Sequence, residues 1–234
     1  TVQAAMGAAF LLNAVWWLAC SLPLLRNYRQ KYYVEKRQQQ VIRISFRQLW
    51  QTLRKIQEKK KIFLFLVAFF FYIDGVYTII DMATAYGSAL GLDTQGLLVA
   101  LLVTQLVAFP SAVVFARLAK TRDTGKLIRV CILAYTAIAL FAIQLDRQWE
   151  FWLLAVCVGL FQGGVQALSR SYFARIIPAE NSGEFFGLFD ICGKGASFLG
   201  TSLVSVTAQI TGSANSGVAV LAVLFVIGFL IFSR

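Results

Sequence analysis

The chain has 234 residues, of which 59% are hydrophobic and 14% are charged, and its formal net charge is +11. An apolar fraction this far above one half excludes an ordinary soluble globular domain. The sequence contains no histidine, which removes the commonest general base and metal ligand, so carboxylates would have to carry any proton chemistry.

Seven apolar runs are long enough to cross the roughly 30 Å of membrane hydrocarbon as helices. They lie at residues 4–25, 62–90, 96–118, 127–145, 151–175, 185–209 and 216–233. A chain of this length has too little polar surface to cover seven helices that are apolar on every side. The sequence therefore predicts an all-α, multi-pass membrane protein with seven transmembrane helices.

The first run is followed by a basic linker at residues 26–61. Within this linker, apolar side chains recur at helical spacing, at Phe46, Leu49, Trp50, Leu53 and Ile56. Two placements fit this amphipathic pattern equally well. The segment can lie on the inner leaflet of the membrane, or it can pack on the cytoplasmic ends of the spans.

Basic residues are distributed unevenly among the connections. They concentrate at 26–61, at 117–129 and around the connection that follows residue 175, whereas the opposite connections carry only Arg147. Loops rich in Lys and Arg stay in the cytoplasm, so the linker and the C-terminus are predicted to be cytoplasmic. Basic loops beside a membrane account for the net positive charge. The predicted partner of these loops is therefore membrane lipid, and no nucleic acid is expected.

The six spans within 62–234 divide into two triplets, at 62–145 and 151–233. The first span of each triplet carries polar residues, whereas the third is almost free of them. Helices that line an aqueous path need polar groups, and helices that face lipid do not. The pattern predicts two three-helix repeats, as in secondary transporters, with the first spans lining the path.

Two carboxylates interrupt the apolar stretch FFFYIDGVYTIIDM at residues 69–82. Asp74 and Asp81 are seven residues apart, which places them on one helical face about 10 Å apart, with Tyr77 and Thr78 between them. A carboxylate in hydrocarbon costs about 2.5 to 3.5 kcal/mol and usually faces water, an ion or a partner group. These four are candidate substrate or coupling residues, and Asp74 is the stronger because Asp81 lies near the predicted outer end. The alternative is hydrogen bonding between helices.

A second candidate group lies in GLFQGGVQALSRSYFARIIP, residues 159–178. Gln162, Gln166 and Ser169 share one face of the predicted helix. Gly163 and Gly164, together with Gly159, permit close helix approach or local unwinding. Their polar groups can hold a polar solute at a cavity wall, or they can hydrogen-bond a neighbouring helix.

Charged residues are also predicted to meet where two successive spans enter the membrane from the cytoplasm. Arg170 and Asp190 lie at similar depth, and Lys194 follows Asp190 by one helical turn. These three predict a cytoplasmic gate or a helix-locking charge network. The alternative for Arg170 is a side chain that extends to the lipid headgroups.

Enzyme motifs are absent from the sequence: there is no GxSxG, no P-loop, no HExxH and no cysteine nucleophile beside a base. We therefore expect no enzymatic activity, no metal site and no cofactor.

Four stretches, QGGVQALSRSYFARIIP, SGEFFGLFDICGKGASFLG, FFFYIDGVYTIIDMATAYG and AVWWLACSLPLL, together resemble the autophagy-related protein 22-like permeases, a branch of the major facilitator superfamily. The resemblance covers essentially the whole chain. It implies that the seven spans correspond to helices six to twelve of a twelve-helix transporter. Residues 1–25 would be helix six, 26–61 the central cytoplasmic linker, and 62–234 the C-terminal six-helix half, a 3+3 inverted repeat.

The resemblance further implies a rocker-switch mechanism in which the helices of Asp74 and of Gln162 and Gln166 line the central cavity. The N-terminal half of the transporter would then be a partner of this chain. Because the yeast relative is associated with amino-acid efflux from the vacuole, amino acids are a candidate substrate class.

One stretch departs from the superfamily pattern. In ARLAKTRDTGK, Arg122 precedes Asp123, whereas the superfamily favours Asp-Arg-x-Gly-Arg in the equivalent loop. The reversed order puts a gate role for Arg122 and Asp123 in question, and Asp123 can instead bind a helix end.

The combined hypothesis is the C-terminal half of a permease in a bacterial inner membrane. It would move a small polar solute by alternating access, driven by a proton or another gradient. The alternatives are a self-contained seven-helix receptor or light-driven pump, and a membrane scaffold without transport. The last span contains no lysine, which counts against a retinal pump.

Overall fold

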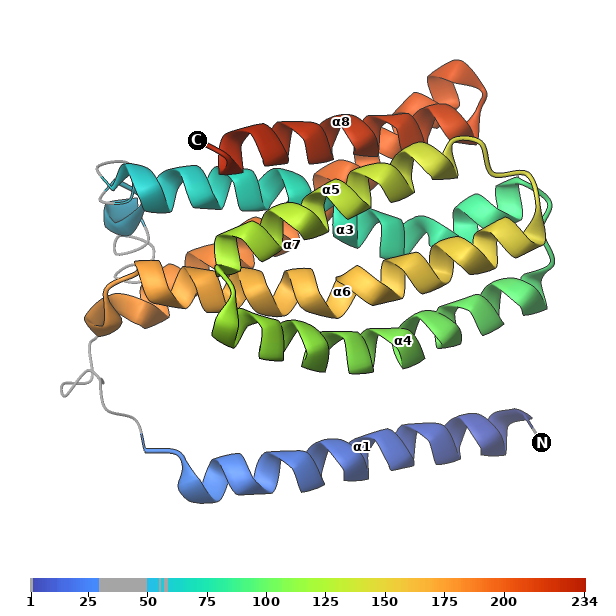
Figure 1. Ribbon diagram of the computed structural model, residues 1–234. Coiled ribbons are helices and arrows are strands. Elements are labelled where there is room, and N and C mark those ends of the chain that lie inside the picture. The colour runs from blue at the N-terminus through green and yellow to red at the C-terminus, as the bar shows by residue number, and fades with distance from the viewer. Residues whose placement is uncertain (1, 30–49, 55, 57–58) are drawn as a thin grey trace. The chain divides into compact units, whose positions relative to one another are not determined.

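The computed structural model describes residues 2–29, 50–54, 56 and 59–234 (Figure 1). The chain divides into two units, Thr1–Val41 and Ile42–Arg234. The first unit contains α1 (Val2–Asn27). The second contains α3 (Lys60–Ala89), α4 (Thr94–Thr121), α5 (Thr124–Ala142), α6 (Gln148–Ile176), the short 3-10 helix η1 (Ala179–Asn181), α7 (Ser182–Thr211) and α8 (Ala214–Phe232).

Helix α1 is apolar around its whole circumference, as expected of a membrane span. Its 26 residues are long enough to cross the hydrocarbon, at about 1.5 Å of rise per residue. Pro23 lies inside the helix, in its last turns.

The helices of the described chain follow the predicted spans to within a few residues, with one qualification. Six of them, α1, α3, α4, α5, α6 and α8, have the length and apolarity of membrane-spanning helices. Helix α7 is long enough at 30 residues, but Glu184, Asp190 and Lys194 and many small polar residues lower its hydropathy. The all-helical membrane architecture is therefore confirmed, and the seventh span stays a prediction.

Asp residues begin two of the helices. The Asp93 carboxylate accepts the N–H of Gly96 (2.8 Å) at the start of α4, and the Asp123 carboxylate accepts the N–H of Lys126 (3.1 Å) at the start of α5. Each caps a backbone donor that the first turn of a helix leaves without a partner. Asp123 thus binds a helix end, which gives a structural reason for the order Arg122–Asp123.

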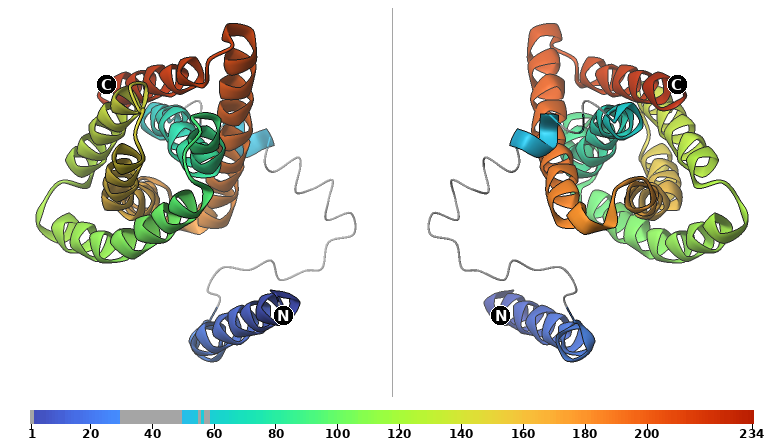
Figure 2. Two further views of the ribbon diagram at one scale, coloured as in Figure 1. Left: turned by 90° about the vertical axis from the view of Figure 1, so that its right-hand side faces the viewer. Right: turned by 90° about the vertical axis from the view of Figure 1, so that its left-hand side faces the viewer.

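The second unit is a bundle in which α3 packs against α4, α6, α7 and α8 and lies among them in the end-on views (Figure 2). Most of the pairings are kept when the first triplet, α3 to α5, is exchanged with the second, α6 to α8, although α7 packs on α8 without an equally close contact between α4 and α5. Helix α3 packs on α7 and α8 as α6 packs on α4 and α5, and the third helices α5 and α8 pack on each other. This pattern is consistent with the bundle of a 3+3 inverted repeat.

Glycines bring α6 close to α4. A side-chain carbon at Gly159 would meet the carbonyl oxygen of Thr104, and one at Gly163 would meet Ala112 and the carbonyl oxygen of Ala108. Small residues allow helix backbones to approach in this way where both helices lie in lipid. The close approach predicted for the glycines of α6 is thereby confirmed.

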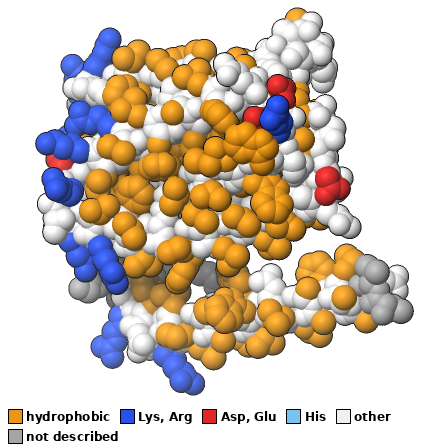
Figure 3. Space-filling view, turned by 45° about the vertical axis from the view of Figure 1, so that its right-hand side comes forward, with side chains coloured by type: hydrophobic (Ala, Val, Ile, Leu, Met, Phe, Trp, Pro, Cys, Tyr) orange, Lys and Arg blue, Asp and Glu red, His pale blue; other side chains and the backbone are white. Residues whose placement is uncertain are grey.

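Lys and Arg side chains gather at one end of the helices, and apolar side chains cover most of the surface beyond it (Figure 3). This end, called the basic end here, contains Lys59–Lys61, the α4–α5 turn, the α6–α7 connection and Arg234. The folded bundle thus brings the dispersed basic segments of the sequence together at one end.

Candidate functional site

Two of the cavities among the described residues of the bundle are relevant to a solute site. The larger has a volume of about 360 Å³ and lies in the half of the bundle away from the basic end, with walls from all six long helices. The smaller, of about 330 Å³, lies nearer the basic end between α3, α6 and α7. It is lined by Phe69, Ile73, Tyr77, Gly163, Gln166, Ala167, Arg170 and Phe189.

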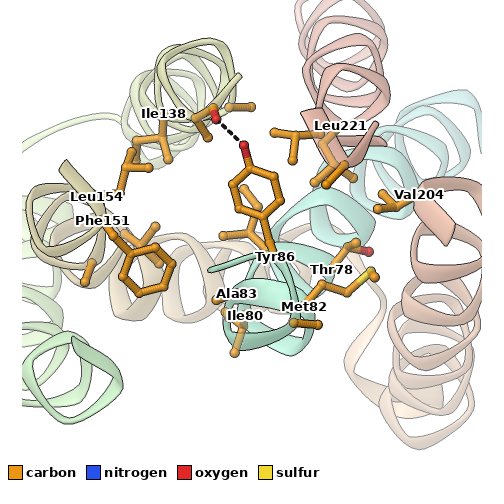
Figure 4. Close-up of a pocket in the computed structure, with 18 of the residues that line it drawn as sticks. Thr78, Ile80, Met82, Ala83, Tyr86, Ile138, Phe151, Leu154, Val204 and Leu221 are labelled. Atoms are coloured by element: carbon orange, nitrogen blue, oxygen red, sulfur yellow. Dashed lines mark hydrogen bonds between the residues drawn. The ribbon is translucent and has the colours of Figure 1, made fainter. Parts of the chain in front are cut away.

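The larger cavity is mainly apolar, and Tyr86 projects into it from α3 (Figure 4). The Tyr86 hydroxyl donates to the carbonyl oxygen of Ala142 (2.6 Å) and lies 2.9 Å from Oδ1 of Asn215. Tyr86 therefore ties the end of α3 that lies away from the basic end to α5 and α8. Its polar atom is occupied by protein, which leaves an apolar ring toward the cavity.

The smaller cavity combines an aromatic wall with polar and charged groups. Phe69 and Phe189 stack with their ring centroids 4.0 Å apart, while Tyr77, Gln166 and Arg170 supply a hydroxyl, an amide and a guanidinium. Pockets that bind small molecules usually have this make-up, with apolar walls and a few placed polar groups. For a polar or anionic solute, the smaller cavity is the better candidate site, because Arg170 gives it a cation and polar groups form a larger share of its wall, whereas the larger cavity is lined by no charged residue.

Arg170 and Asp190 form the predicted ion pair. Nη2 of Arg170 lies 2.7 Å from Oδ1 of Asp190, and the two side chains are 60% and 50% exposed. The Arg170 guanidinium also lies over the rings of Phe186 and Phe189, at 5.9 and 5.6 Å from their centroids. A pair this exposed contributes only about 0–1 kcal/mol to stability. Its importance is positional, because the same guanidinium lines the smaller cavity.

Lys194 is exposed, and within the described chain the Arg170–Asp190 contact is the only ion pair. The predicted three-residue network is therefore a two-residue pair in this structure. Arg122 and Asp123 are exposed on the α4–α5 turn and do not pair with each other. Hydrogen bonds from the N–H groups of Lys126 and Gly125 hold the pKa of the Asp123 carboxyl below its usual range, as expected of a helix cap.

Asp74 is 2% exposed and forms a contact between α3 and α7. Its Oδ1 accepts the backbone N–H of Gly200 (2.9 Å) and faces the Thr78 hydroxyl (3.4 Å). Asp74 lines neither cavity, although Thr78 lines the larger one. The carboxylate is thus held between two helices at the boundary of the cavity, and its hydrogen bonds fit the alternative of a helix–helix tie.

Asp81 is exposed, lines neither cavity, and is not brought together with the partners of Asp74. The two carboxylates share a helix, as predicted, but they have different surroundings. Tyr77 and Thr78, which lie between them, also separate, because Tyr77 lines the smaller cavity and Thr78 the larger.

The polar residues of α6 separate in a similar way. Gln162 lines the larger cavity and Gln166 the smaller one. Within the described residues, Oε1 of Gln162 is buried without a hydrogen-bond partner. Ser169 is fully buried, donates to the carbonyl of Val165 (2.6 Å) and lies 2.7 Å from the Tyr72 hydroxyl. Ser169 therefore joins α6 to α3 rather than lining a cavity.

Several residues of the site carried no strong signal in the sequence. Gly200 is one glycine among many in α7, and its role depends on a carboxylate 126 positions away. Phe186 and Phe189 surround Arg170 because they lie on the same α7 turns as Asp190. In the sequence, only their spacing from Asp190 indicated that they would lie near Arg170. Tyr86 and Asn215 meet across 129 positions.

Comparison with known proteins places the whole chain in one family. Residues 2–234 match the family described as vacuole effluxer Atg22 like. The chain is 45% identical over 232 residues to the MFS-type transporter YxiO of Bacillus subtilis. The aligned region covers 99% of this chain and 54% of that protein.

Fungal relatives are more distant. Identity is 27% over 250 residues with Autophagy-related protein 22-2 of Emericella nidulans, covering 93% of this chain and 42% of that protein. It is 24% over 219 residues with Autophagy-related protein 22 of Kluyveromyces lactis, covering 85% and 44%. The chain thus spans about half the length of the curated relatives it matches. On these matches and its apolar helices, the chain belongs to the Atg22-like family of MFS-type membrane transporters.

Proposed function

We propose that this chain forms the C-terminal half of a secondary active transporter that moves a small polar solute across a membrane by alternating access. The observation that carries the proposal is the smaller cavity, where Tyr77, Gln166 and Arg170 meet an aromatic wall. Alternating access moves one helical repeat or bundle against another around a site near the bilayer midplane. Helices α3, α6 and α7 supply this site from one half.

Amino acids are the proposed substrate class. A carboxylate suits the Arg170 guanidinium, and an amide such as that of Gln166 can both donate and accept hydrogen bonds. The aromatic wall suits an apolar side chain. The family description, a vacuole effluxer, agrees with export of small solutes by relatives of this chain.

In the proposed mechanism, the Arg170–Asp190 pair acts as a gate between the smaller cavity and the basic end. Arg170 lines the cavity while it binds Asp190. Because both side chains are exposed, the ion pair can break without leaving either charge buried and unpaired. We propose that the basic end faces the cytoplasm, as the positive-inside rule favours, and that the membrane is a bacterial inner membrane. Asp74, held at the contact of α3 and α7, is the proposed coupling residue, since a change in its proton or ion occupancy would alter that contact.

Uptake of a labelled amino-acid panel by the full-length protein in proteoliposomes tests this function. We expect Gln166→Ala to weaken the apparent affinity for the transported solute about fivefold, because one hydrogen bond contributes about 1 kcal/mol. Gln144→Ala, at an exposed glutamine beyond the end of α5, is the matched control and should leave uptake unchanged. Equal affinities for the two variants would contradict the site, and no gradient-driven uptake of any amino acid would contradict the substrate class.

A further inference from the structure

Residues 50–54 and 56, in the second half of the linker, are helical and have two different faces. Thr52 and Ile56, one turn apart, are 2% and 1% exposed. Trp50 and Leu53 lie on another face and are 62% and 42% exposed, and Arg54 beside them is exposed too. One face is thus packed on protein, while the other presents an aromatic ring, an aliphatic side chain and a cation.

The buried face attaches the segment to the basic end of α7. The Thr52 hydroxyl donates to Oε2 of Glu184 (2.7 Å), in the first turn of α7, and Ile56 belongs to the main apolar core of the bundle. The N–H of Lys59 donates to the carbonyl of Ile56 (3.0 Å), just before α3 begins at Lys60. The segment therefore bridges the adjacent ends of α3 and α7, and it lies beside α7 in Figure 2.

We infer from the neighbouring charges that the exposed face lies at the depth of lipid headgroups. The apolar run of α3 starts at Ile62, immediately after the exposed Lys59, Lys60 and Lys61, so these cations mark the edge of the hydrocarbon. Between Trp50 and Lys61 the basic residues outnumber the single acid, Glu58. Tryptophan is enriched at this membrane boundary, and basic residues close to it bind anionic lipid.

We propose that residues 50–54 and 56 form an interfacial clip, which binds α7 through Thr52, packs on the core of the bundle through Ile56, and binds anionic lipid headgroups through Trp50, Leu53, Arg54 and Lys59–Lys61. The linker helix was predicted either to lie on the inner leaflet or to pack on the ends of the spans. In the proposed clip, one face of the segment binds lipid and the opposite face packs on the helices. Anionic lipid at the clip stabilises the docked segment. Because Thr52 binds Glu184, the content of anionic lipid in the leaflet is thereby linked to the end of α7. The clip depends only on the docked geometry and not on the solute that is carried.

The test uses the full-length protein in nanodiscs of phosphatidylcholine alone, or of phosphatidylcholine with phosphatidylglycerol. The readout is hydrogen–deuterium exchange of the peptide that covers residues 50–56. We expect exchange to be at least about fivefold slower in the anionic nanodiscs, since each basic residue near the surface contributes measurably to lipid attraction. In neutral nanodiscs, Thr52→Val should speed exchange because it removes the hydrogen bond to Glu184.

The combined variant Arg54→Gln, Lys59→Gln and Lys60→Gln should lose the difference between the two lipids. Its control is Lys120→Gln, Arg122→Gln and Lys126→Gln, which removes three exposed cations from the same basic end but outside the clip. The control should keep the lipid dependence. Identical exchange of the unsubstituted protein in both lipids would overturn the proposal and would point to a protein segment as the occupant of this face. Equal losses in the test and control variants would overturn it as well.

Discussion

Gly200→Ala is expected to lower the free energy of unfolding by about 2 to 4 kcal/mol. A side-chain carbon at Gly200 would collide with Oδ1 of Asp74 and with the Thr78 hydroxyl oxygen, both fully packed in the α3–α7 contact. Overpacking a tight interior costs about 1 to 3 kcal/mol. Displacing the Asp74 carboxylate from the Gly200 N–H adds the cost of a buried polar group without a partner, about 1 to 3 kcal/mol.

The measurement is reversible unfolding in mixed detergent micelles, followed by circular dichroism. Gly195→Ala is the matched control on the same helix, because Gly195 is exposed and a carbon added there meets nothing within 4 Å. Alanine is the better helix former by up to about 1 kcal/mol, so Gly195→Ala should be neutral or slightly stabilising. If the two variants were equally stable, Gly200 would not be a point of close contact between α3 and α7.

Asp74→Asn is expected to reduce gradient-driven uptake of the transported solute by about tenfold or more, while the protein stays folded. The asparagine amide keeps the shape of the side chain, and its oxygen can still accept the N–H of Gly200. The substitution removes the charge, to which the proposed function assigns the coupling. A charge in hydrocarbon costs about 2.5 to 3.5 kcal/mol and usually has a functional role there. Solute exchange without a gradient should be affected much less, because the smaller cavity does not contain Asp74.

Proteoliposomes with an imposed pH gradient provide this measurement, and Asp81→Asn is the control. Asp81 is on the same helix but is exposed and outside both cavities, so uptake should be unchanged when its charge is removed. Gradient-driven uptake that survives in Asp74→Asn would refute the coupling role and leave Asp74 as a helix tie.

The parts of the fold that depend on local composition could be predicted from the sequence. Long apolar runs fix the helices because no other backbone structure satisfies its hydrogen bonds in lipid. The basic end follows from the same logic, since its cations lie in connections that alternate along the chain. Composition alone does not establish α7 as a membrane span, because Asp190, Lys194 and its small polar residues give it lower hydropathy than its neighbours.

The candidate site could be predicted only in part, because cavity walls are set by partners far away in the sequence. Equal depth was sufficient to pair Arg170 with Asp190. A shared helical face was not sufficient for Gln162 and Gln166, because each faces a different cavity. Asp74 shows the same limit: its position on α3 was evident, but the Gly200 N–H that binds it emerges only when α7 packs on α3.

The proposed transport requires that water and solute reach the smaller cavity. The most direct test is labelling of Gln166→Cys by a membrane-impermeant maleimide in a full-length protein whose native cysteines, among them Cys20, Cys131, Cys157 and Cys192, have been replaced. Val223→Cys, on the exposed apolar surface of α8, is the lipid-facing control. We predict that Gln166→Cys is labelled much faster than Val223→Cys and that the transported solute slows its labelling. Labelling of Gln166→Cys that is as slow as that of Val223→Cys, from both sides of the membrane, would contradict the claim.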